Sequence, residues 1–290
     1  MNTGASVGPG RPRGRRAAEE VSVRIGGVPL GNGAPLVLIA GLNVIESEGE
    51  TLEAAAWMRD VAARHRLPLV FKASVDKANR SSLGSYRGPG FDEGLRILAR
   101  VKTELGLPLL TDVHEPAQAK QAAEIVDCLQ VPAFLCRQTD LIVACAATGR
   151  PVNLKKGQFM SPGETRHAVQ KALGHGSGGV FLTERGTTFG YNDLVVDFRG
   201  LVEMRRYAPV CFDATHSVQR PGAGASASDG DRTLVAPLAR AAAAVGIDAL
   251  FVEGHPNPDA APCDGPSQLD FEAVDALLGE VSAVLRALAP

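Results

Sequence analysis

Basic and hydroxyl side chains gather in one stretch of the sequence, FKASVDKANRSS at residues 71–82. The stretch starts in the apolar run Leu69–Phe71, which predicts a buried strand, and it continues with Lys72, Lys77 and Arg80. A lysine supplies a mobile point charge, and an arginine supplies a planar fork that fits two phosphate oxygens. The stretch therefore indicates an anion-binding site at the end of a strand, although a solvated basic loop would have the same composition.

Polar residues also follow the other apolar runs that the sequence predicts as strands. They are Asn43 after the first run, Asp112 and His114 after the third, Gln130 and Arg137 around the fourth, Lys155 and Lys156 after the fifth, Glu184 and Arg185 after the sixth, Asp213 and His216 after the seventh, and Glu253 and His255 after the eighth. Cations at four separate strand ends would repel one another in one cavity unless an anion joined them. The pattern therefore favours a site for an anionic ligand over a set of solvated loops.

The cations divide into two groups, which indicates two anions or one ligand with both a phosphate and a carboxylate. The first group is Lys77, Lys155 and Arg185, and the second is Arg80 with its neighbours Asn79 and Ser81. Each group combines point charges or a guanidinium with other donors, as phosphate recognition requires.

Groups that exchange protons or bind metals also lie near the predicted strand ends. His216, Glu253 and Asp264 offer one imidazole and two carboxylates, a set suited to proton transfer or to a divalent metal that would still need a fourth ligand. A polar residue that only satisfies hydrogen bonds is the alternative for His216. Cys263 is expected to be a buried spectator, and the stretch Ala223–Arg232 predicts either a mobile loop over the site or an irregular surface segment.

Eight apolar runs alternate with helical patterns and set the expected fold class. The runs are Leu36–Ala40, Leu69–Phe71, Leu109–Thr111, Cys128–Val131, Val152–Leu154, Val180–Leu182, Val210–Phe212 and Leu250–Val252. The clearest helical segments are Glu50–His65, Phe91–Leu105, Pro116–Val126, Leu141–Ala147, Pro162–Leu173, Asp231–Val245 and Phe271–Leu288. This alternation predicts an α/β fold, a (β/α)8 TIM barrel, with a doubly wound open sheet as the alternative. In a barrel, all of the polar strand ends meet at the C-terminal mouth.

The N-terminal segment is expected to differ from the rest of the chain. Residues 1–20 are rich in Gly, Pro, Ala and Arg and predict a disordered extension, with a transit peptide or a nucleic-acid-binding arm as alternatives. Val21 to Leu30 alternates around Gly26-Gly27, which predicts an N-terminal β-hairpin over the bottom of the larger fold. Residues 21–290 are predicted to form a single barrel domain.

The composition excludes several classes of protein. A net charge of −2 over 290 residues gives no general basicity for nucleic acid. The five cysteines are odd in number and lack CxxC spacing, which indicates reduced thiols in a cytoplasmic protein. No apolar run approaches the roughly 18 residues that span a membrane, so no membrane partner is expected. No signal peptide is predicted either, because no apolar core follows the N-terminal arginines.

The motifs resemble those of the 3-deoxy-D-manno-octulosonate 8-phosphate synthase family, also called 2-dehydro-3-deoxyphosphooctonate aldolases. The matching segments are GLNVIES (41–47), FKASVDKANRSSLGSYRGPG (71–90), TDVHEP (111–116), QVPAFLCRQTDL (130–141), NLKKGQFMSPGE (153–164), ERGTTFGYNDLVVD (184–197), FDATHSVQ (212–219) and VEGHPNP with CDGPSQL (252–269). They are long and occur in order from about residue 21 to the C-terminus.

The resemblance implies a homotetrameric barrel enzyme, a transferase that condenses phosphoenolpyruvate with D-arabinose 5-phosphate for lipopolysaccharide inner-core synthesis. It implies that phosphoenolpyruvate contacts Lys72, Lys77, Ala133, Lys155, Arg185 and His216. It implies that the pentose phosphate contacts Asn79, Arg80, Ser81, Asp112, Gln130 and Arg137, with Arg80 reaching in from a neighbouring subunit. The implied catalytic residues are Asn43, Lys77, His216 and Asp264.

The same resemblance bears on metal dependence. The metal-dependent class of this family has a cysteine in the first-strand motif, where this sequence has Asn43, and the last motif here reads Cys263-Asp264-Gly265-Pro266. A thiolate is a strong ligand for a transition metal and a neutral amide is not. We therefore expect no required metal and no cofactor, with His216, Glu253 and Asp264 as vestiges of a metal site.

Three alternatives remain at the level of sequence. A related synthase that uses erythrose 4-phosphate has a Lys-Pro-Arg-Thr-Ser motif, which the KANRSS segment at residues 77–82 does not match. A non-catalytic barrel that binds phosphorylated metabolites would be expected to have lost part of a motif. A Schiff-base aldolase would need a lysine with a low pKa, against which the many neighbouring anion-binding groups argue.

Overall fold

Eight parallel strands close into a barrel in the computed structural model, which describes residues 23–80, 82–222 and 229–289. In order around the barrel they are β3 (Val37–Val44), β4 (Leu69–Ser74), β5 (Leu109–Asp112), β6 (Cys128–Val131), β7 (Val152–Lys155), β8 (Val180–Glu184), β11 (Val210–Asp213) and β14 (Ala249–Glu253). β14 pairs with β3 and β8 pairs with β11, so the ring has no open edge. The predicted (β/α)8 barrel is confirmed and the open sheet was wrong. Every residue of these strands is buried, which explains why runs such as Val180–Leu182 and Leu250–Val252 are continuously apolar rather than alternating.

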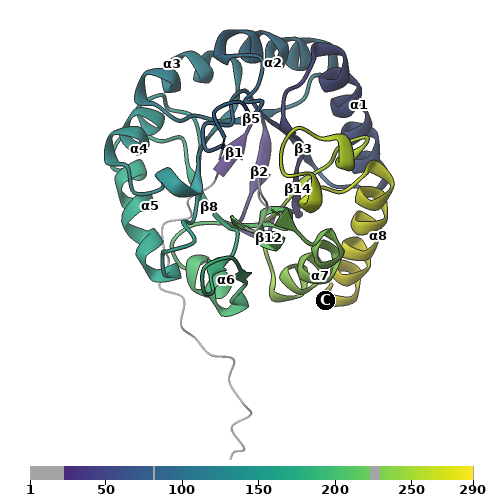
Figure 1. Cartoon of the computed structure of the whole chain (residues 1–290). Coiled ribbons are helices and arrows are strands. Elements are labelled where there is room, and N and C mark those ends of the chain that lie inside the picture. The colour runs from purple at the N-terminus through teal and green to yellow at the C-terminus, as the bar shows by residue number, and fades with distance from the viewer. Residues whose placement is uncertain (1–22, 81, 223–228, 290) are drawn as a thin grey trace, which may run out of the picture.

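The helices form an outer ring around the barrel (Figure 1). They are α1 (Glu48–Arg64), α2 (Phe91–Leu105), α3 (Pro116–Ile125), α4 (Thr139–Ala146), α5 (Thr165–Leu173), α6 (Phe198–Met204), α7 (Val235–Val245) and α8 (Phe271–Leu288). Ser47 and Asp270 are the N-caps of α1 and α8. Their side-chain oxygens accept hydrogen bonds from the backbone N–H groups of Glu50 and Ala273, which would otherwise have no partner in the first turn. The sequence missed α6 because seven residues give too little periodicity. The segments predicted as starting at Pro162 and Asp231 begin with 3₁₀ turns at Pro162–Glu164 and Arg232–Leu234.

The predicted N-terminal hairpin is present as β1 (Val23–Ile25) and β2 (Val28–Leu30). Gly26 and Gly27 turn it with φ of 52° and 96°, which non-glycine residues rarely adopt. The side chains of Val23, Ile25 and Leu30 pack with residues from the first halves of the strands, and the hairpin crosses the centre of the ring in Figure 1. It therefore closes the N-terminal end of the barrel and leaves the C-terminal end for a site.

Two apolar cores position that site. The larger core lies between strands and helices, and the smaller one fills the barrel interior above the hairpin. Phe251 belongs to the interior core, whereas Glu253, two residues further along the same strand, contacts lysine and asparagine. The interior thus changes from apolar to polar between these two positions. All five cysteines are buried and unpaired, and no helix in the described part of the chain is long and apolar enough to cross a membrane.

Two short hairpins that the sequence did not predict border the C-terminal mouth. β9 (Thr187–Thr188) pairs with β10 (Leu194–Val195), and β12 (Gln219–Arg220) pairs with β13 (Asp229–Gly230). The predicted extension at residues 1–20, and residues 223–228 of the predicted loop, lie outside the described residues.

Candidate active site

A cavity of about 530 Å³ opens at the C-terminal mouth of the barrel. Most of the residues singled out in the sequence line it, namely Lys72, Lys77, Asn79, Arg80, Asp112, Gln130, Ala133, Lys155, Arg185, His216 and Asp264. Asn43 and Glu253 lie beneath its floor, where they contact Asp264 and Lys72. Arg137 is exposed and is not among the described residues that line the cavity, and Ser81 lies outside the described residues. The fold therefore brings residues from seven of the eight barrel strands or the segments after them to one cavity, as a barrel mouth requires.

The first part of the floor is built around Lys72 on β4. Its Nζ donates to Glu253 Oε1 at 2.7 Å and to Ser74 Oγ at 2.9 Å, and the side chain is almost fully buried. Glu253 also accepts from Asn43 Nδ2 at 2.5 Å. Burial alone would raise the pKa of Glu253, but the charges of His216, Lys72 and nearby lysines hold it well below its usual range. Glu253 is therefore an anion that fixes its neighbours at the floor.

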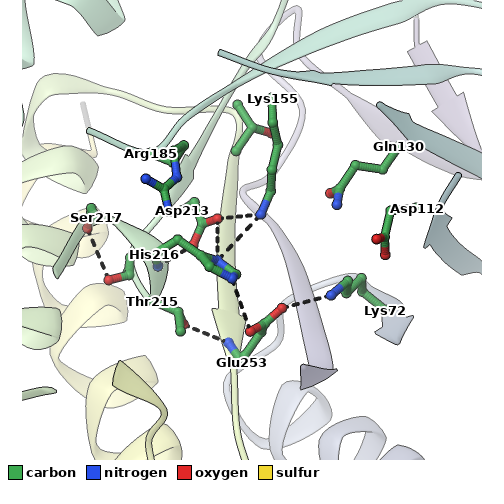
Figure 2. Close-up of polar contacts among 12 residues, drawn as sticks. Lys72, Asp112, Gln130, Lys155, Arg185, Asp213, Thr215, His216, Ser217 and Glu253 are labelled. Atoms are coloured by element: carbon green, nitrogen blue, oxygen red, sulfur yellow. Dashed lines mark hydrogen bonds and ion pairs between the residues drawn. The ribbon is translucent and has the colours of Figure 1, made fainter. Parts of the chain in front are cut away.

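The second part of the floor joins Lys155, Asp213 and His216 (Figure 2). Lys155 Nζ donates to Asp213 Oδ2 at 2.7 Å, and His216 Nδ1 lies 2.8 Å from the same oxygen. With Nδ1–H donating to Asp213, His216 Nε2 faces Glu253 Oε2 at 3.5 Å and Asp264 Oδ2 at 4.0 Å. Burial alone would raise the pKa of Asp213, but His216 and Lys155 keep it well below its usual range. This arrangement fixes the imidazole orientation, as a group that transfers protons at Nε2 requires.

Three cations that line the cavity have no carboxylate partner among the residues that the structure describes. Within residues 23–80, 82–222 and 229–289, no ion pair is formed by Lys77, Arg80 or Arg185, whereas Lys72 and Lys155 each have one. Arg185 Nη1 and Arg80 Nε are buried without a hydrogen-bond partner in the described chain. Burial alone would lower the pKa of the Lys77 ammonium, but the negative charges of Glu253 and Asp112 have the larger effect and raise that pKa. Buried donors without partners are costly, so the cavity is suited to an anion.

The opposite wall carries Asp112 and Gln130 (Figure 2). Ser74 Oγ donates to Asp112 Oδ1 at 2.5 Å, and His114 Nε2 lies 3.3 Å from Asp112 Oδ2. Burial alone would raise the pKa of Asp112, but His114 and the lysines hold it well below its usual range. Gln130 Oε1 accepts from Asn153 Nδ2 at 3.0 Å, which leaves the amide donor of Gln130 to face the cavity. The wall thus offers an acceptor and a donor side by side, as hydroxyl groups need.

The loop after β4 places Asn79 and Arg80 at the rim. Arg87 forms a two-bond ion pair with Asp76, and its carbonyl accepts from the backbone N–H of Lys77 at 2.7 Å. Arg80 Nη2 donates to the carbonyl oxygen of Pro262 at 2.9 Å, within the same chain. One chain by itself therefore places Arg80 at its own cavity, and its contribution to a neighbouring subunit stays a prediction.

Sequence reasoning did not assign several residues that the fold places at the site. Lys156 is fully buried, with Nζ 3.4 Å from the carbonyl oxygens of Gly157, Met160 and Gly186 and 3.1 Å from Thr187 Oγ1. It therefore ties the loop after β7 to the segment after Arg185. Gln158 and Gln219 also line the cavity, and Gln219 Oε1 accepts from Arg185 Nη2. The sequence could have indicated Lys156, because it stands beside Lys155 at a strand end, but nothing in the sequence indicated Gln158 or Gln219.

The residues around Asn43 do not fit a metal ion. In the described chain, no group of three or more His, Cys, Asp and Glu side chains is arranged to hold one. The amide nitrogen of Asn43 donates to both Glu253 and Asp264, at 2.5 and 3.2 Å, and Lys72 occupies the other oxygen of Glu253. A hydrogen-bond donor thus lies between the carboxylates where a cation would be bound. Asp264 itself adopts a left-handed backbone with φ of 52°, which an aspartate tolerates better than most residues.

Comparison with known proteins gives consistent matches over most of the chain. A family model described as the DAHP synthetase I family matches residues 16–286. The chain is 53% identical over 259 residues to a 2-dehydro-3-deoxyphosphooctonate aldolase of Desulfatibacillum aliphaticivorans, covering 89% of this chain and 95% of that one. It is 56% identical over 261 residues to the protein of that name from Synechococcus sp., covering 90% and 92%. The Pseudoalteromonas translucida protein of the same name is 49% identical over 271 residues, covering 92% and 95%.

Proposed function

This chain belongs to the DAHP synthetase I family, and we propose on that premise that it condenses phosphoenolpyruvate, D-arabinose 5-phosphate and water to 3-deoxy-D-manno-octulosonate 8-phosphate and phosphate. The relatives named as 2-dehydro-3-deoxyphosphooctonate aldolases support this reaction. The observation that carries it is the set of three cations, Lys77, Arg80 and Arg185, that line one cavity without carboxylate partners in the described residues. Two phosphorylated substrates would supply those partners.

The cavity divides between the two substrates according to its charges. Phosphoenolpyruvate is assigned to the floor, at Lys72, Lys77, Ala133, Lys155, Arg185 and His216. The pentose phosphate is assigned to the rim and the opposite wall, at Asn79, Arg80, Asp112 and Gln130, and the motif match also assigns it to Ser81 and the exposed Arg137. In this assignment the sugar hydroxyls would contact Asp112 and Gln130, which line the same cavity as the lysines of the floor.

The reaction forms one carbon–carbon bond and one carbon–oxygen bond from water, and it breaks the carbon–oxygen bond to phosphate. C3 of phosphoenolpyruvate attacks the aldehyde carbon, water adds to C2, and the resulting intermediate expels phosphate when the C2–O bond breaks. Positive charge develops at C2 and negative charge on the former aldehyde oxygen. Lys77, which lines the cavity, is assigned to stabilise the oxyanion, and His216 Nε2 is assigned to give or accept a proton because Nδ1 contacts Asp213. Asn43 and His216, with neighbouring groups such as Asp264, are assigned to hold the attacking water.

The acceptor specificity is expected to follow the KANRSS loop. Arabinose 5-phosphate should be turned over far better than erythrose 4-phosphate, because the loop carries Asn79 and Arg80 rather than the motif of the related synthases. Phosphate release from phosphoenolpyruvate with each sugar measures the difference, and comparable rates would contradict the assignment.

Replacing Arg80 with alanine should weaken pentose phosphate binding by about 2–4 kcal/mol, because the charge-assisted hydrogen bonds of its guanidinium to the phosphate are lost. Arg96→Ala, which removes an exposed arginine paired with Glu93, is the matched control.

We further propose that the reaction needs no metal and no other cofactor, because Asn43 donates hydrogen bonds into the space that a metal would need. Activity should survive prolonged treatment with a chelator and should not rise when Mn²⁺, Co²⁺ or Zn²⁺ is added back. The change Asn43→Cys should raise metal affinity, since a thiolate then joins one imidazole and two carboxylates. Loss of wild-type activity in chelator, with recovery on adding one of these ions, would contradict the proposal.

We also propose that the protein is a homotetramer and that it is cytoplasmic. Large apolar side chains are exposed around the mouth, with Phe134 at 56%, Phe159 at 58% and Phe189 at 67% exposure in the isolated chain. Association of several copies would cover such side chains. Five unpaired cysteines agree with a reducing compartment. Light scattering of the purified protein gives the assembly size, and a monomer would argue against this part.

A further inference from the structure

The ring of Phe251 lies directly beneath the lysines of the cavity floor. Its side chain is fully buried and belongs to the interior core of the barrel. Lys155 Nζ lies 4.3 Å from the ring centroid and Lys72 Nζ lies 5.5 Å from it. Both distances are within the roughly 6 Å over which a cation is attracted to an aromatic face. One ring therefore meets two ammonium groups that come from different strands, β7 and β4.

Strand geometry explains why Phe251 is at this place. Ala249 and Phe251 face the barrel interior, whereas Leu250 and Val252 pack in the outer core. Side chains alternate along a strand, so Glu253 faces inward again, one layer nearer the mouth. Phe251 is thus the last apolar layer below the polar floor. Glu253 from the same strand pairs with Lys72 and lies above the ring.

The two lysines are each held from two sides. Lys72 has Glu253 at 2.7 Å, Lys155 has Asp213 at 2.7 Å, and both have the ring of Phe251. A lysine stem has four rotatable bonds, so its ammonium can swing unless several contacts hold it. Lys72 Nζ also donates to Ser74 Oγ at 2.9 Å and Lys155 Nζ lies 3.4 Å from His216 Nδ1, and the ring of Phe251 is the contact that the two lysines share. A ring face below restricts that motion and fixes the height of the charge. The carboxylates hold the lysines from the side, and the ring sets how far apart and how deep the two charges lie.

We propose that Phe251 is a positioning residue, whose ring face holds the ammonium groups of Lys155 and Lys72 at the spacing that receives an anionic substrate. The identity of that substrate, phosphoenolpyruvate, rests on the proposed function. The positioning itself rests only on the ring and the two lysines. If Phe251 only filled space in the core, changing the charge distribution of its ring at constant shape would have no effect on substrate binding.

Fluorination of this one ring separates the two roles. Phenylalanine with one, two or three fluorines is inserted at position 251, which keeps the shape nearly constant and withdraws the negative charge of the ring face step by step. We expect KM for phosphoenolpyruvate to rise with each fluorine, by about tenfold in total, with a smaller change in kcat. The melting temperature should stay nearly constant. Phe251→Leu should raise KM as well, but it also opens a space in the core, so the fluorinated series decides.

Phe181 supplies the matched control. It is fully buried in the same interior core, and no cation–π contact to it occurs in the described chain. The same fluorines at position 181 should leave KM unchanged. A flat KM across the position 251 series, or an equal rise at position 181, would overturn the proposal.

A second measurement does not depend on the reaction. Inorganic phosphate is titrated into each fluorinated protein in a calorimeter, and its dissociation constant should rise in the same order as KM. If phosphoenolpyruvate is not a substrate but phosphate binding still weakens step by step, the positioning role holds and the proposed function fails. If phosphate affinity is constant across the series, the positioning role fails whatever the substrate is.

Discussion

Replacing Arg185 with alanine is expected to lower kcat/KM for phosphoenolpyruvate by about 10²-fold or more, the effect of losing one anion clamp. Arg185 is 5% exposed, lines the cavity and has one guanidinium nitrogen without a partner in the described chain. Burial lowers the pKa of Arg185, against the opposing charges of Asp213 and Asp264, but a guanidinium stays protonated throughout the working range. Its charge is therefore already desolvated before the substrate arrives. Steady-state kinetics at saturating pentose phosphate measure the loss.

Lys155→Ala should give a loss of similar size for a different reason. It removes a floor cation and also leaves Asp213 and His216 without their lysine. We expect part of the loss in kcat for Lys155→Ala, and mainly a rise in KM for Arg185→Ala. Arg199→Ala is the control, because Arg199 on α6 is 91% exposed and pairs with Asp197, the N-cap of that helix. Wild-type kinetics in both cavity variants would exclude this cavity as the active site.

The fold was predictable because each barrel strand is buried on both faces. Leu69–Phe71 and Val180–Leu182 are continuous apolar runs, whereas a strand with one face in solvent would alternate. Helix α8 has the predicted bounds, and α1 begins two residues before the predicted Glu50. The short α6 and the two-residue strands at the mouth were not predictable, since their positions depend on contacts with loops distant in the sequence.

The sequence predicted which charged residues meet at the site, but it did not predict which of them form ion pairs with one another. Parallel strands bring their polar ends together, so Lys72, Lys155 and Arg185 were expected to share a cavity. The sequence could not show that Lys72 pairs with Glu253, 181 positions away, while Arg185 keeps an unpartnered nitrogen. Phe251 gave no signal at all, because a buried aromatic in an apolar run looks like any other core residue until a lysine is placed over its face.

Changing Glu253 to glutamine is expected to destabilise the protein by about 3–5 kcal/mol at neutral pH, as the breaking of a buried ion pair does. Glu253 is fully buried and is in contact with Lys72, Asn43 and His216. Burial lowers the pKa of the Lys72 ammonium even with Glu253 beside it, so without that carboxylate the charge loses its largest compensation and keeps only the weaker effect of Asp112. Urea unfolding at pH 7 measures the loss, and an unchanged midpoint would contradict it.

The stability that Glu253 contributes is expected to depend on pH in one direction. The folded pKa of Glu253 lies below its unfolded value near 4.3, so its stabilisation is complete above that value and is lost as the pH falls through the folded pKa. The difference in stability between the wild type and Glu253→Gln should therefore be constant from pH 6 to 8, near neutrality, and shrink below about pH 4. The double variant Glu253→Gln with Lys72→Met removes both charges and should recover much of the stability at pH 7 without recovering activity. A double variant as unstable as Glu253→Gln alone would show that the ion pair is not what Glu253 contributes, because the uncompensated lysine would then have cost nothing.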